Sequence, residues 1–462
     1  MDKTNYKHET TFVPGPSFEI DLAPLDALHP TVWVCRLLVF KCKSVEQRDA
    51  QLLAFKKGLQ ELVLLCPVLG GQIALANHGI EAKYDLLSGR GITLVVRDLY
   101  ASIKPFTQLE KLNFCSSQLP YDLLMPTPDD VNAACKTQFS SIDGGTIISF
   151  AISHNIVDGV GTDEVMRMLS GFTRLAQQAP LEKRTALECE TGTLGLDRSV
   201  LRNISSHGVF KIEDHPAYRI TSQHGDVMES KSTTQVTSRD QSQEIPVLLR
   251  LCPDGLSQLK LDATTSGRSF ISTHDALAAL MWRSILYIRT QRNEAQGMRS
   301  STTNFFMPSN ARQHLNLPAS YIGNAVYQLS ASLDVSVLLS DSGLQQAAHA
   351  IRRAITNVNS DLVSSYMAEL KTRWLDWGFL YDAATTTFGM GTDFSSTILY
   401  SLDWGDAFGP MVRYRFPWSA GSAGYCVLPK LPDGTAEAIV TVRPEEVALL
   451  RSEKLFGKYM EI

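Results

Sequence analysis

The stretch TIISFAISHNIVDGVGTDEVMRMLSGFTRLA, residues 146–176, indicates the fold class of this chain. Residues 146–153 are apolar or β-branched and predict a buried strand. After a short turn with two glycines, Thr162 is the expected N-cap of a helix, and the helix has an apolar stripe of Val165, Leu169, Phe172 and Ala176. A buried strand that leads through a tight turn into an amphipathic helix is typical of α/β proteins.

The composition fits a globular protein with a large core. The chain has 462 residues, of which 44% are hydrophobic and 20% charged, so extended disorder is excluded. A net charge of −5 argues against a nucleic-acid partner. No apolar run reaches the roughly 20 residues that span a bilayer, and the first residues contain no apolar signal core. We therefore expect a cytoplasmic protein with no membrane partner.

The chain divides at a polar stretch rich in Ser, Thr and Gln, which predicts a long surface connection. We assign residues 1–181 to a first domain, 182–245 to a crossover linker and 246–462 to a second domain. Both domains mix strand and helix signals, and the expected elements are a strand at 32–40, a helix from 45 after a Ser44–Gln47 capping box, a strand at 246–251, a helix at 273–290 capped by Ser272 or Thr273, and a strand at 437–442.

The turn at residues 153–159 is the compact cluster of chemical interest. His154 follows the buried strand directly, and a neutral imidazole in such a turn can take a proton from an attacking hydroxyl or amine. With ten histidines in the chain, about half a His-x-x-x-Asp match is expected by chance. Gly159 makes the pattern rarer, but a buried structural histidine with a turn aspartate, Asp158, has equal weight on this motif alone. The eight cysteines form no Cys-x-x-Cys pair, so no zinc site is expected.

At this hexad the sequence resembles the acyl-CoA-dependent BAHD acyltransferases, whose motif is His-x-x-x-Asp-Gly. The likeness is greatest to the fungal branch, which includes trichothecene 3-O-acetyltransferase. Further segments match in order along nearly the whole chain: Leu22-Ala23-Pro24-Leu25-Asp26, Pro67-Val68-Leu69-Gly70-Gly71, Ser272-Thr273-His274-Asp275-Ala276-Leu277 with Trp282, Asn310-Ala311-Arg312, and Tyr321-Ile322-Gly323-Asn324.

The resemblance implies two chloramphenicol-acetyltransferase-like α/β domains, each a mixed sheet with flanking helices, joined by the crossover loop. It implies acyl-CoA, with acetyl-CoA as first choice, as co-substrate, a small secondary metabolite as acceptor, and neither a metal nor a permanently bound cofactor. His154 would act as general base in a ternary complex and later protonate the leaving thiolate. The expected state is a monomer.

The resemblance also assigns supporting residues. Asp158 would pair with Arg312 and, with Gly159, hold the turn. Ser272 and Thr273 would bind the CoA. Asp403 begins a degenerate copy of the family's second motif, Asp403-Trp404-Gly405-Asp406-Ala407-Phe408-Gly409, and is assigned a structural role. Asn310 and Ser153 depart from the residues that the family usually has at these positions.

Other charged residues allow weaker hypotheses. His274 and Asp275 could form a second acid–base pair, but we favour a place in the first turn of the 273–290 helix, where an acid stabilises the helix dipole. Lys260, Arg268 and Arg283 could meet CoA phosphates, although each alone is more typical of a solvated surface charge.

Two other functions remain open. One keeps the fold but acts as a stand-alone condensation-type or cyclising enzyme on a carrier-bound or intramolecular electrophile. The other is a non-catalytic binding scaffold. Ser153 counts against the first, because condensation-type enzymes usually have a histidine there, and the intact His154 and Asp158 count against the second.

Overall fold

The computed structural model describes most of the chain, namely residues 8–18, 20–28, 32–78, 81–87, 89, 91–126, 132–178, 195–204, 210–220, 244–265, 270–295, 301–373, 377–379, 388–417 and 424–462. Contacts divide it into two compact units: Met1–Ile204 with Asn316–Ala325 and Thr397–Pro417, and Ser205–Leu315 with Val326–Ser396 and Trp418–Ile462. The segments 316–325 and 397–417, which the linear division of the sequence assigns to the second domain, thus group with the first unit.

The first unit contains a six-stranded mixed sheet in the order β1-β5-β6-β7-β2-β14, where β5 and β6 run parallel. Its strands are β1 (His8–Val13), β2 (Trp33–Lys41), β5 (Ile92–Asp98), β6 (Cys135–Ile142), β7 (Gly145–Ser153) and β14 (Arg413–Arg415), and β3 (Gln72–His78) pairs with β4 (Glu81–Leu87) in a separate hairpin. Its α-helices are α1 (Pro24–Leu28), α2 (Val45–Leu65), α3 (Phe106–Lys111), α4 (Tyr121–Leu124), α5 (Gly159–Leu175) and α7 (Ser199–Arg202).

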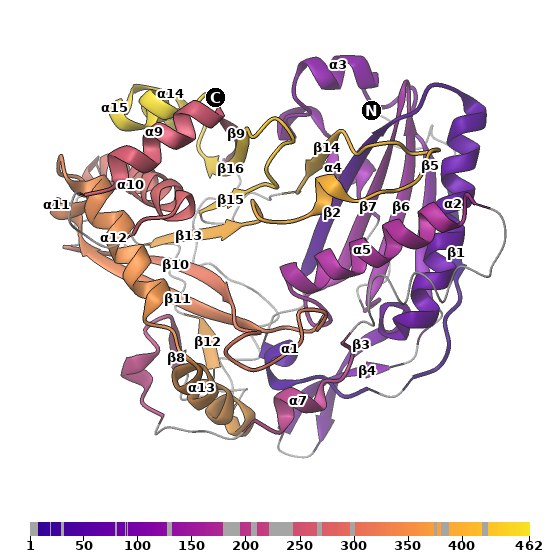
Figure 1. Cartoon of the computed structure of the whole chain (residues 1–462), viewed down its shortest axis with the longest axis horizontal. Helices are drawn as coiled ribbons and strands as arrows, with labels where there is room; N and C mark the ends of the chain where they lie inside the picture. Colours follow the sequence, from indigo (N-terminus) through magenta and orange to yellow (C-terminus); the bar gives the residue numbers. More distant parts are fainter. Residues whose placement is uncertain are drawn as a thin grey trace. The chain divides into compact units, whose positions relative to one another are not determined.

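The central strands of this sheet are covered on both faces. All residues of β6 and β7 are buried, which explains their nearly continuous apolar and β-branched sequence. In Figure 1, α2 and α5 cross one face of the sheet. Phe55 of α2 packs there against Phe139 and Phe150, with ring centroids 6.3 and 6.0 Å apart. Burying one such side chain contributes about 1.5–3 kcal/mol.

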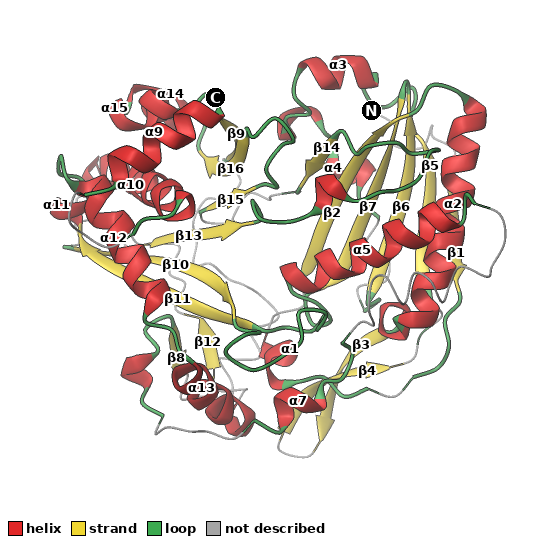
Figure 2. Ribbon diagram, in the orientation of Figure 1, coloured by secondary structure: helices red, strands yellow, loops and turns green. Residues whose placement is uncertain are grey.

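The second unit has its own six-stranded mixed sheet, in the order β11-β10-β13-β15-β16-β9. Its strands are β9 (Ile245–Leu251), β10 (Thr302–Asn310), β11 (Val326–Asp334), β13 (Phe388–Asp393), β15 (Tyr425–Val427) and β16 (Ala436–Val442), and β8 (Tyr218–Ile220) pairs with β12 (Trp377–Phe379). Its α-helices are α9 (Pro253–Ala263), α10 (Thr273–Ala295), α11 (Val335–Leu338), α12 (Gly343–Thr356), α13 (Ser360–Arg373), α14 (Glu446–Ser452) and α15 (Lys454–Tyr459). Figure 2 shows that both units mix helices and strands, which confirms the predicted fold class of mixed sheets with flanking helices.

Helix α10 packs on the second sheet through Trp282. The indole stacks on Phe305 of β10 with ring centroids 5.5 Å apart, and its Nε1–H donates to the Thr303 hydroxyl at 3.1 Å. Trp282 is fully buried, so its polar group needs this partner. The helix predicted at residues 273–290 is therefore present and extends five residues further.

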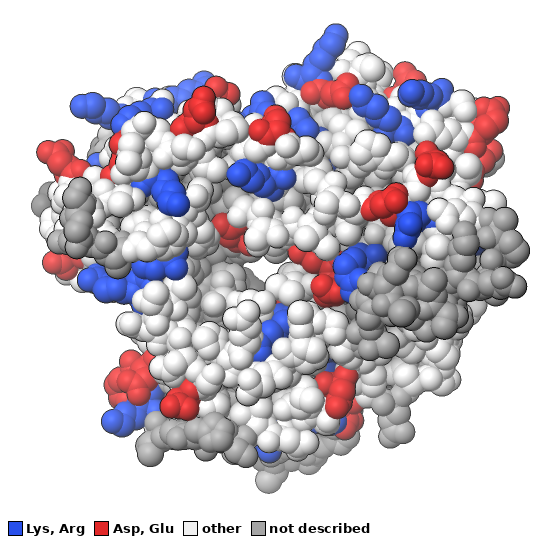
Figure 3. All heavy atoms as spheres, viewed as in Figure 1, with Lys and Arg blue, Asp and Glu red and all other residues white. Residues whose placement is uncertain are grey.

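The surface carries both signs of charge. On the face shown in Figure 3, Lys and Arg side chains are interspersed with Asp and Glu, in keeping with the mildly negative net charge of −5. None of the helices in the described ranges combines the length and the apolarity that a bilayer span needs.

Candidate active site

His154 lies where β7 ends and the chain turns toward α5. Its backbone N–H donates to the carbonyl of Val32 at 2.8 Å, next to the β2–β7 pair Trp33–Ser153, so the sheet fixes the start of the turn. The buried Asn155 then donates from Nδ2 to the carbonyl of Asp26 at 2.8 Å. The strand, turn and helix predicted here are present, and the imidazole itself is partly exposed.

Asp158 ends the turn and is the N-cap of α5. Its Oδ1 accepts from Gly161 N–H at 2.8 Å and its Oδ2 from Ala325 N–H at 3.0 Å. The N-cap of the helix is thus Asp158, four residues before the predicted cap Thr162, and the hydroxyl of Thr162 instead donates to the Asp158 carbonyl at 2.8 Å. Asp158 therefore ties the turn both to α5 and to segment 316–325.

Segment 316–325 lies very close to α5. A Cβ on Gly161 would come within 1.9 Å of the Ile322 carbonyl oxygen, so this position needs glycine. Arg312, the residue expected to pair with Asp158, belongs to the second unit, where it donates from N and Nη1 to Asn310 Oδ1 at 3.1 and 3.2 Å. The pair of Asp158 with Arg312 stays a prediction.

The imidazole of His154 contacts a residue 170 positions away in the sequence. Its Nδ1 lies 3.0 Å from Asn324 Oδ1. The Asn324 Nδ2 donates to the His154 carbonyl at 2.7 Å and to Asp26 Oδ1 at 2.9 Å. Burial lowers the pKa of His154 below its usual value, and the hydrogen bond of the imidazole to its own backbone, the charge of Asp158 and the Asn324 hydrogen bond offset only part of this effect. The imidazole is therefore neutral at neutral pH and can accept a proton.

Asp26 connects this site to a residue that sequence analysis missed. Arg198 is 2% exposed and places its Nε 3.4 Å from Asp26 Oδ2, while its Nη2 donates to the Ile156 carbonyl at 2.7 Å. The sequence places Arg198 in the predicted surface crossover. That prediction is wrong for this residue, because the part of the crossover around α7 packs into the first unit and buries the guanidinium. Arg198 follows Asp197 within a polar stretch of sequence, and no pattern there indicates that its side chain is buried.

Asp403 lies at the opposite end of α5 from Asp158. Its carboxylate is 3.7 Å from Nε of Arg174, in the last turn of that helix, and its Oδ1 accepts from Gly405 N–H at 2.8 Å. Sixteen residues of helix separate Arg174 from Asp158, about 24 Å at 1.5 Å per residue. The buried Trp404 next to it packs edge-on against Phe40 at 5.6 Å. This loop holds α5 and β2 together at a distance from His154.

In the second unit, Ser272 and Asp275 form a capping box at the start of α10. The Ser272 N–H donates to Asp275 Oδ2 at 2.6 Å, and Asp275 N–H donates to the Ser272 hydroxyl at 3.2 Å. Asp275 also accepts from Nε of Arg352 at 2.7 Å. The Ser272 hydroxyl thus serves the cap, whereas the hydroxyl of Thr273 has no partner within the described residues.

His274 is bonded to a carboxylate, and that carboxylate is Asp393 rather than its sequence neighbour Asp275. Nδ1 of His274 lies 2.5 Å from Asp393 Oδ2. Burial alone would lower the pKa of His274, but the hydrogen bond and charge of Asp393, together with the charge of Asp275, outweigh it and raise the pKa above its usual value. This histidine is therefore biased toward its cationic form.

An exposed aromatic ring lies near the start of α10. Phe270 is 67% exposed, with Nζ of Lys260 5.2 Å and Cζ of Arg352 5.5 Å from its ring centroid. Arg283 is buried and donates to the Leu338 carbonyl at 3.3 Å, which makes a role toward phosphate unfavourable. Arg268 lies outside the described residues.

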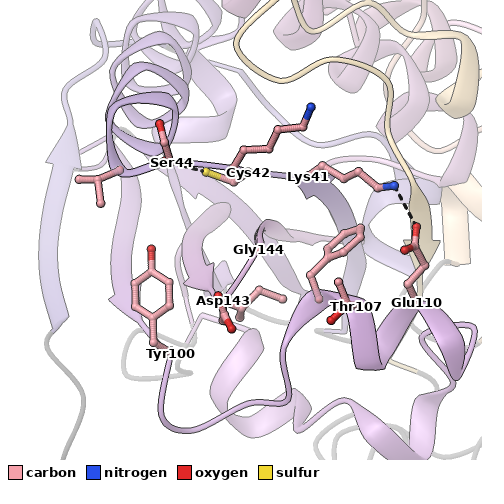
Figure 4. A pocket seen from close by; sticks show the side chains of 12 residues that line it. Lys41, Cys42, Ser44, Tyr100, Thr107, Glu110, Asp143 and Gly144 are labelled. Atoms are coloured by element: carbon pink, nitrogen blue, oxygen red, sulfur yellow. Dashed lines mark hydrogen bonds and ion pairs between the residues drawn. The ribbon is translucent and has the colours of Figure 1, made fainter.

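A cavity of about 560 Å³ opens elsewhere in the first unit (Figure 4). It is lined by Lys41, Cys42, Lys43, Ser44, Val45, Tyr100, Phe106, Thr107, Glu110, Ile142, Asp143 and Gly144. Lys41 forms an ion pair with Glu110 at 3.1 Å across its rim. Lys41 ends β2, whose first residue Trp33 pairs beside His154, so this cavity lies at the far end of the strand from the imidazole. Within the described ranges, no three His, Cys, Asp or Glu side chains are arranged to hold a metal ion.

The model of the Transferase family matches residues 12–456 of this chain. The chain belongs to that family and is a BAHD-type acyltransferase. Among curated relatives, an enoyl-CoA isomerase/hydratase of Penicillium crustosum is 28% identical over 96% of this chain, and the chain spans 51% of that protein's length. An acyltransferase of a Phoma species is 25% identical over 96% of both chains.

The fold of this BAHD acyltransferase has close solved counterparts. The trichothecene 3-O-acetyltransferase of Fusarium sporotrichioides, solved with coenzyme A and T-2, superposes with a TM-score of 0.77 over 96% of this chain and 99% of that one. At 21% identity, this likeness establishes a shared fold. The family model and the fungal acyltransferases among the relatives confirm the predicted membership in the fungal branch of the family.

Proposed function

We propose that this protein transfers an acyl group, with acetyl as the first candidate, from acyl-CoA to a hydroxyl of a small secondary metabolite, and that His154 is the general base. The observation that carries the proposal is a partly exposed imidazole whose pKa is lowered by burial and whose Nδ1 is engaged by Asn324. Such a group is neutral near pH 7 and has one ring nitrogen left to receive a proton.

The proposed reaction needs two proton transfers through the same imidazole. His154 takes the proton of the acceptor hydroxyl while the oxygen attacks the thioester carbonyl. The tetrahedral oxyanion then collapses, the carbon–sulfur bond breaks, and the imidazolium returns its proton to the CoA thiolate. The products are an ester and free CoA, and the histidine ends as it began. This route needs neither a metal nor a covalent intermediate.

For the nucleotide end of acyl-CoA, we propose the surface around Phe270 and Thr273. The exposed Phe270 ring offers a face on which a base can stack, and Lys260 and Arg352 beside it carry positive charge suited to phosphate. Thr273 adds a hydroxyl at the positive end of the α10 dipole. Ser272 supports this surface as the cap rather than as a direct ligand.

The choice of an acetyl donor and a hydroxyl acceptor follows the relatives' names. The relatives include the trichothecene 3-O-acetyltransferase and an eremophilane O-acetyltransferase of Penicillium rubens, which is 23% identical over 94% of this chain. Both names specify transfer to oxygen. We therefore rank acetyl-CoA above longer acyl-CoAs and alcohols above amines as substrates of this chain.

The test is incubation of the purified protein with a panel of acyl-CoAs and small alcohols and amines, read by mass spectrometry for acylated product and free CoA. We expect product with wild type and with the control variant His314→Ala, and none above background with His154→Ala. Consumption of carrier-bound but not CoA-bound acyl groups would support the condensation-type alternative. Acyl-CoA binding without turnover across the panel would support the scaffold.

A further inference from the structure

Three buried polar residues of the first unit form a chain behind His154, and we call Arg198, Asp26 and Asn324 the support chain. Asp26 and Asn324 are fully buried and Arg198 is 2% exposed. Asp26 lies in α1, Arg198 just before α7 and Asn324 just before β11, so the three residues are far apart in the sequence. Buried polar groups are costly unless satisfied, so a connected set that ends on the proposed base invites a functional explanation.

The orientation of the Asn324 amide follows from its neighbours. Nδ2 faces two atoms that can only accept, the His154 carbonyl oxygen at 2.7 Å and Asp26 Oδ1 at 2.9 Å. The amide nitrogen must therefore point at them, and the amide oxygen must point at His154 Nδ1, 3.0 Å away. The reversed amide would place its oxygen against two other acceptors.

This orientation determines the tautomer of His154. An amide oxygen has lone pairs and no hydrogen, so the Nδ1 that faces it must carry the proton. In the neutral ring the lone pair then lies on Nε2. A base that carried its lone pair on Nδ1 would direct it at Asn324, where a substrate proton cannot arrive.

We propose that the support chain is a positioning device for the acyl transfer, in which Asn324, held by Asp26, locks His154 as the Nδ1–H tautomer and Arg198 keeps Asp26 in place. The inference deepens the proposed function and rests on His154 as its base. Asn324, Asp26 and Arg198 touch no reacting atom in this proposal and act only through the imidazole.

Asp26 adds a charge effect to the geometric one. Its Oδ1 also accepts from Asn324 N–H at 3.0 Å, so both amide groups of that residue are held by one carboxylate oxygen. Withdrawal of the Nδ2 hydrogen toward the carboxylate makes the amide oxygen more negative, which favours the imidazolium that forms during the reaction. Asp26 also accepts from Ala23 N–H at 3.0 Å, which fixes α1.

Arg198 offsets the cost of the buried carboxylate and ties it to the catalytic turn. Its Nε faces Asp26 Oδ2 at 3.4 Å, and its Nη2 holds the Ile156 carbonyl, two residues after His154. A Cβ on Gly323 would come within 1.9 Å of Arg198 Nη1, so glycine before Asn324 makes room for the guanidinium. Other charges that act on the imidazole are Asp158 and Arg36.

The first experiment compares wild type with Asn324→Ala. We expect kcat to fall about tenfold or more with little change in KM, because the imidazole loses both its preferred tautomer and its fixed orientation. Long-range ¹⁵N–¹H correlation spectra of ¹⁵N-histidine-labelled protein should show His154 protonated on Nδ1 in wild type and a mixture in the variant. A wild-type spectrum with the proton on Nε2 overturns the proposal.

The pH profile gives an independent readout. Asn324→Ala removes the hydrogen-bond acceptor that raises the pKa of the His154 imidazole, so we expect the acidic limb of the kcat/KM profile to move to lower pH. Asn155→Ala is the matched control, because it removes another amide bonded to Asp26 without touching the imidazole ring. We expect it to lower the melting temperature and to leave the acidic limb in place. Equal limbs in all three proteins overturn the proposal.

The double variant with His154→Ala separates positioning from mere structure. If Asn324 acts only through the imidazole, Asn324→Ala lowers no further the residual rate of His154→Ala. A further tenfold loss would show a separate structural role and would overturn the proposal. If His154→Ala alone keeps full turnover, the proposed function is wrong. If His154→Ala is inactive but Asn324→Ala is fully active, the proposed function stands and only the proposal for the support chain is overturned.

Discussion

His154 in the first unit and His274 in the second share a setting but differ in their partner. His154 lies in the turn that leads into α5, and His274 lies in the first turn of α10. Each is bonded through Nδ1, His154 to the amide oxygen of Asn324 and His274 to the carboxylate of Asp393. Burial acts to lower the pKa of both histidines, but the net pKa lies below the usual value for His154 and above it for His274. The partner, and not burial, thus decides whether a buried histidine is a neutral base or a cation.

The largest effect should separate the two histidines by turnover. We expect His154→Ala to lower kcat by about 10²–10⁴, the usual contribution of a general base, in the acyl-transfer assay. His274→Ala should lower kcat less than about tenfold, since a cation cannot take the acceptor proton. Circular dichroism checks that both variants are folded. A greater loss in the second variant would reverse the assignment of the base.

Stability should respond most at the anchors of the catalytic turn. Asp158→Ala removes two hydrogen bonds to a buried carboxylate, to Gly161 and Ala325, so we expect a loss of about 1.5–3 kcal/mol for each charged hydrogen bond. Urea denaturation measures it. Asp197→Ala is the matched control, because Asp197 likewise accepts from a backbone N–H, that of Ser199 at 2.8 Å, but is exposed. Equal losses would show that burial of Asp158 does not matter.

Local signals were enough to predict the framework around His154. Apolar runs predicted β2 and β7, and the Ser44–Gln47 pair predicted the start of α2, where Gln47 N–H donates to the Ser44 hydroxyl. The start of α5 was misplaced because Thr162 has the composition of a cap, whereas the turn lets Asp158 reach Gly161 N–H first. Cap choice depends on backbone direction, which a sequence pattern does not encode.

The partners of His154 could not be predicted from local pattern. Asn324 lies 170 residues away on a segment that joins the first unit, and no periodicity or spacing links it to the turn. The family resemblance drew attention to Asp26 and Asn324 but gave neither a role. Arg198 is hidden in a polar stretch, because its burial depends on Asp26 and the Ile156 carbonyl rather than on apolar neighbours.

The pH dependence of stability should distinguish the cationic histidine from the neutral one. The folded pKa of His274 is raised, so its stabilising contribution is complete below the unfolded pKa of about 6.5 and is lost as pH rises through the folded pKa. Burial alone would raise the pKa of Asp393, but the hydrogen bond and charge of His274, together with the hydrogen bonds from Ser395, outweigh it and lower that pKa. The Asp393 carboxylate therefore stabilises the fold above its unfolded pKa of about 3.9, and the effect is lost as pH falls through the folded pKa.

The pair should therefore stabilise most between about pH 4 and pH 6.5. We expect the melting temperature of His274→Ala to lie furthest below wild type in that window and to approach it as pH rises through the folded pKa of His274. The control is His274→Ala made in an Asp393→Asn background, where the partner of the imidazole is absent and the excess loss in that window should disappear. For His154 the sign is opposite, because its lowered pKa makes the protonated form unfavourable in the fold, so wild-type activity should persist below about pH 6.5.

The smallest effect should come from the carboxylate that touches neither histidine. Asp403 is 70% exposed and lies 3.7 Å from Arg174, and ion pairs of this kind contribute about 0.2–1 kcal/mol. We expect Asp403→Asn to change kcat less than about twofold and to shift the melting temperature little, since Trp404 and the loop around it keep their packing. Asp393→Asn, by contrast, should lower the pKa of His274 measurably by NMR. If Asp403→Asn abolished turnover, the loop around Asp403 would act on the catalytic centre through α5. Its assignment to a structural role away from His154 would then be wrong.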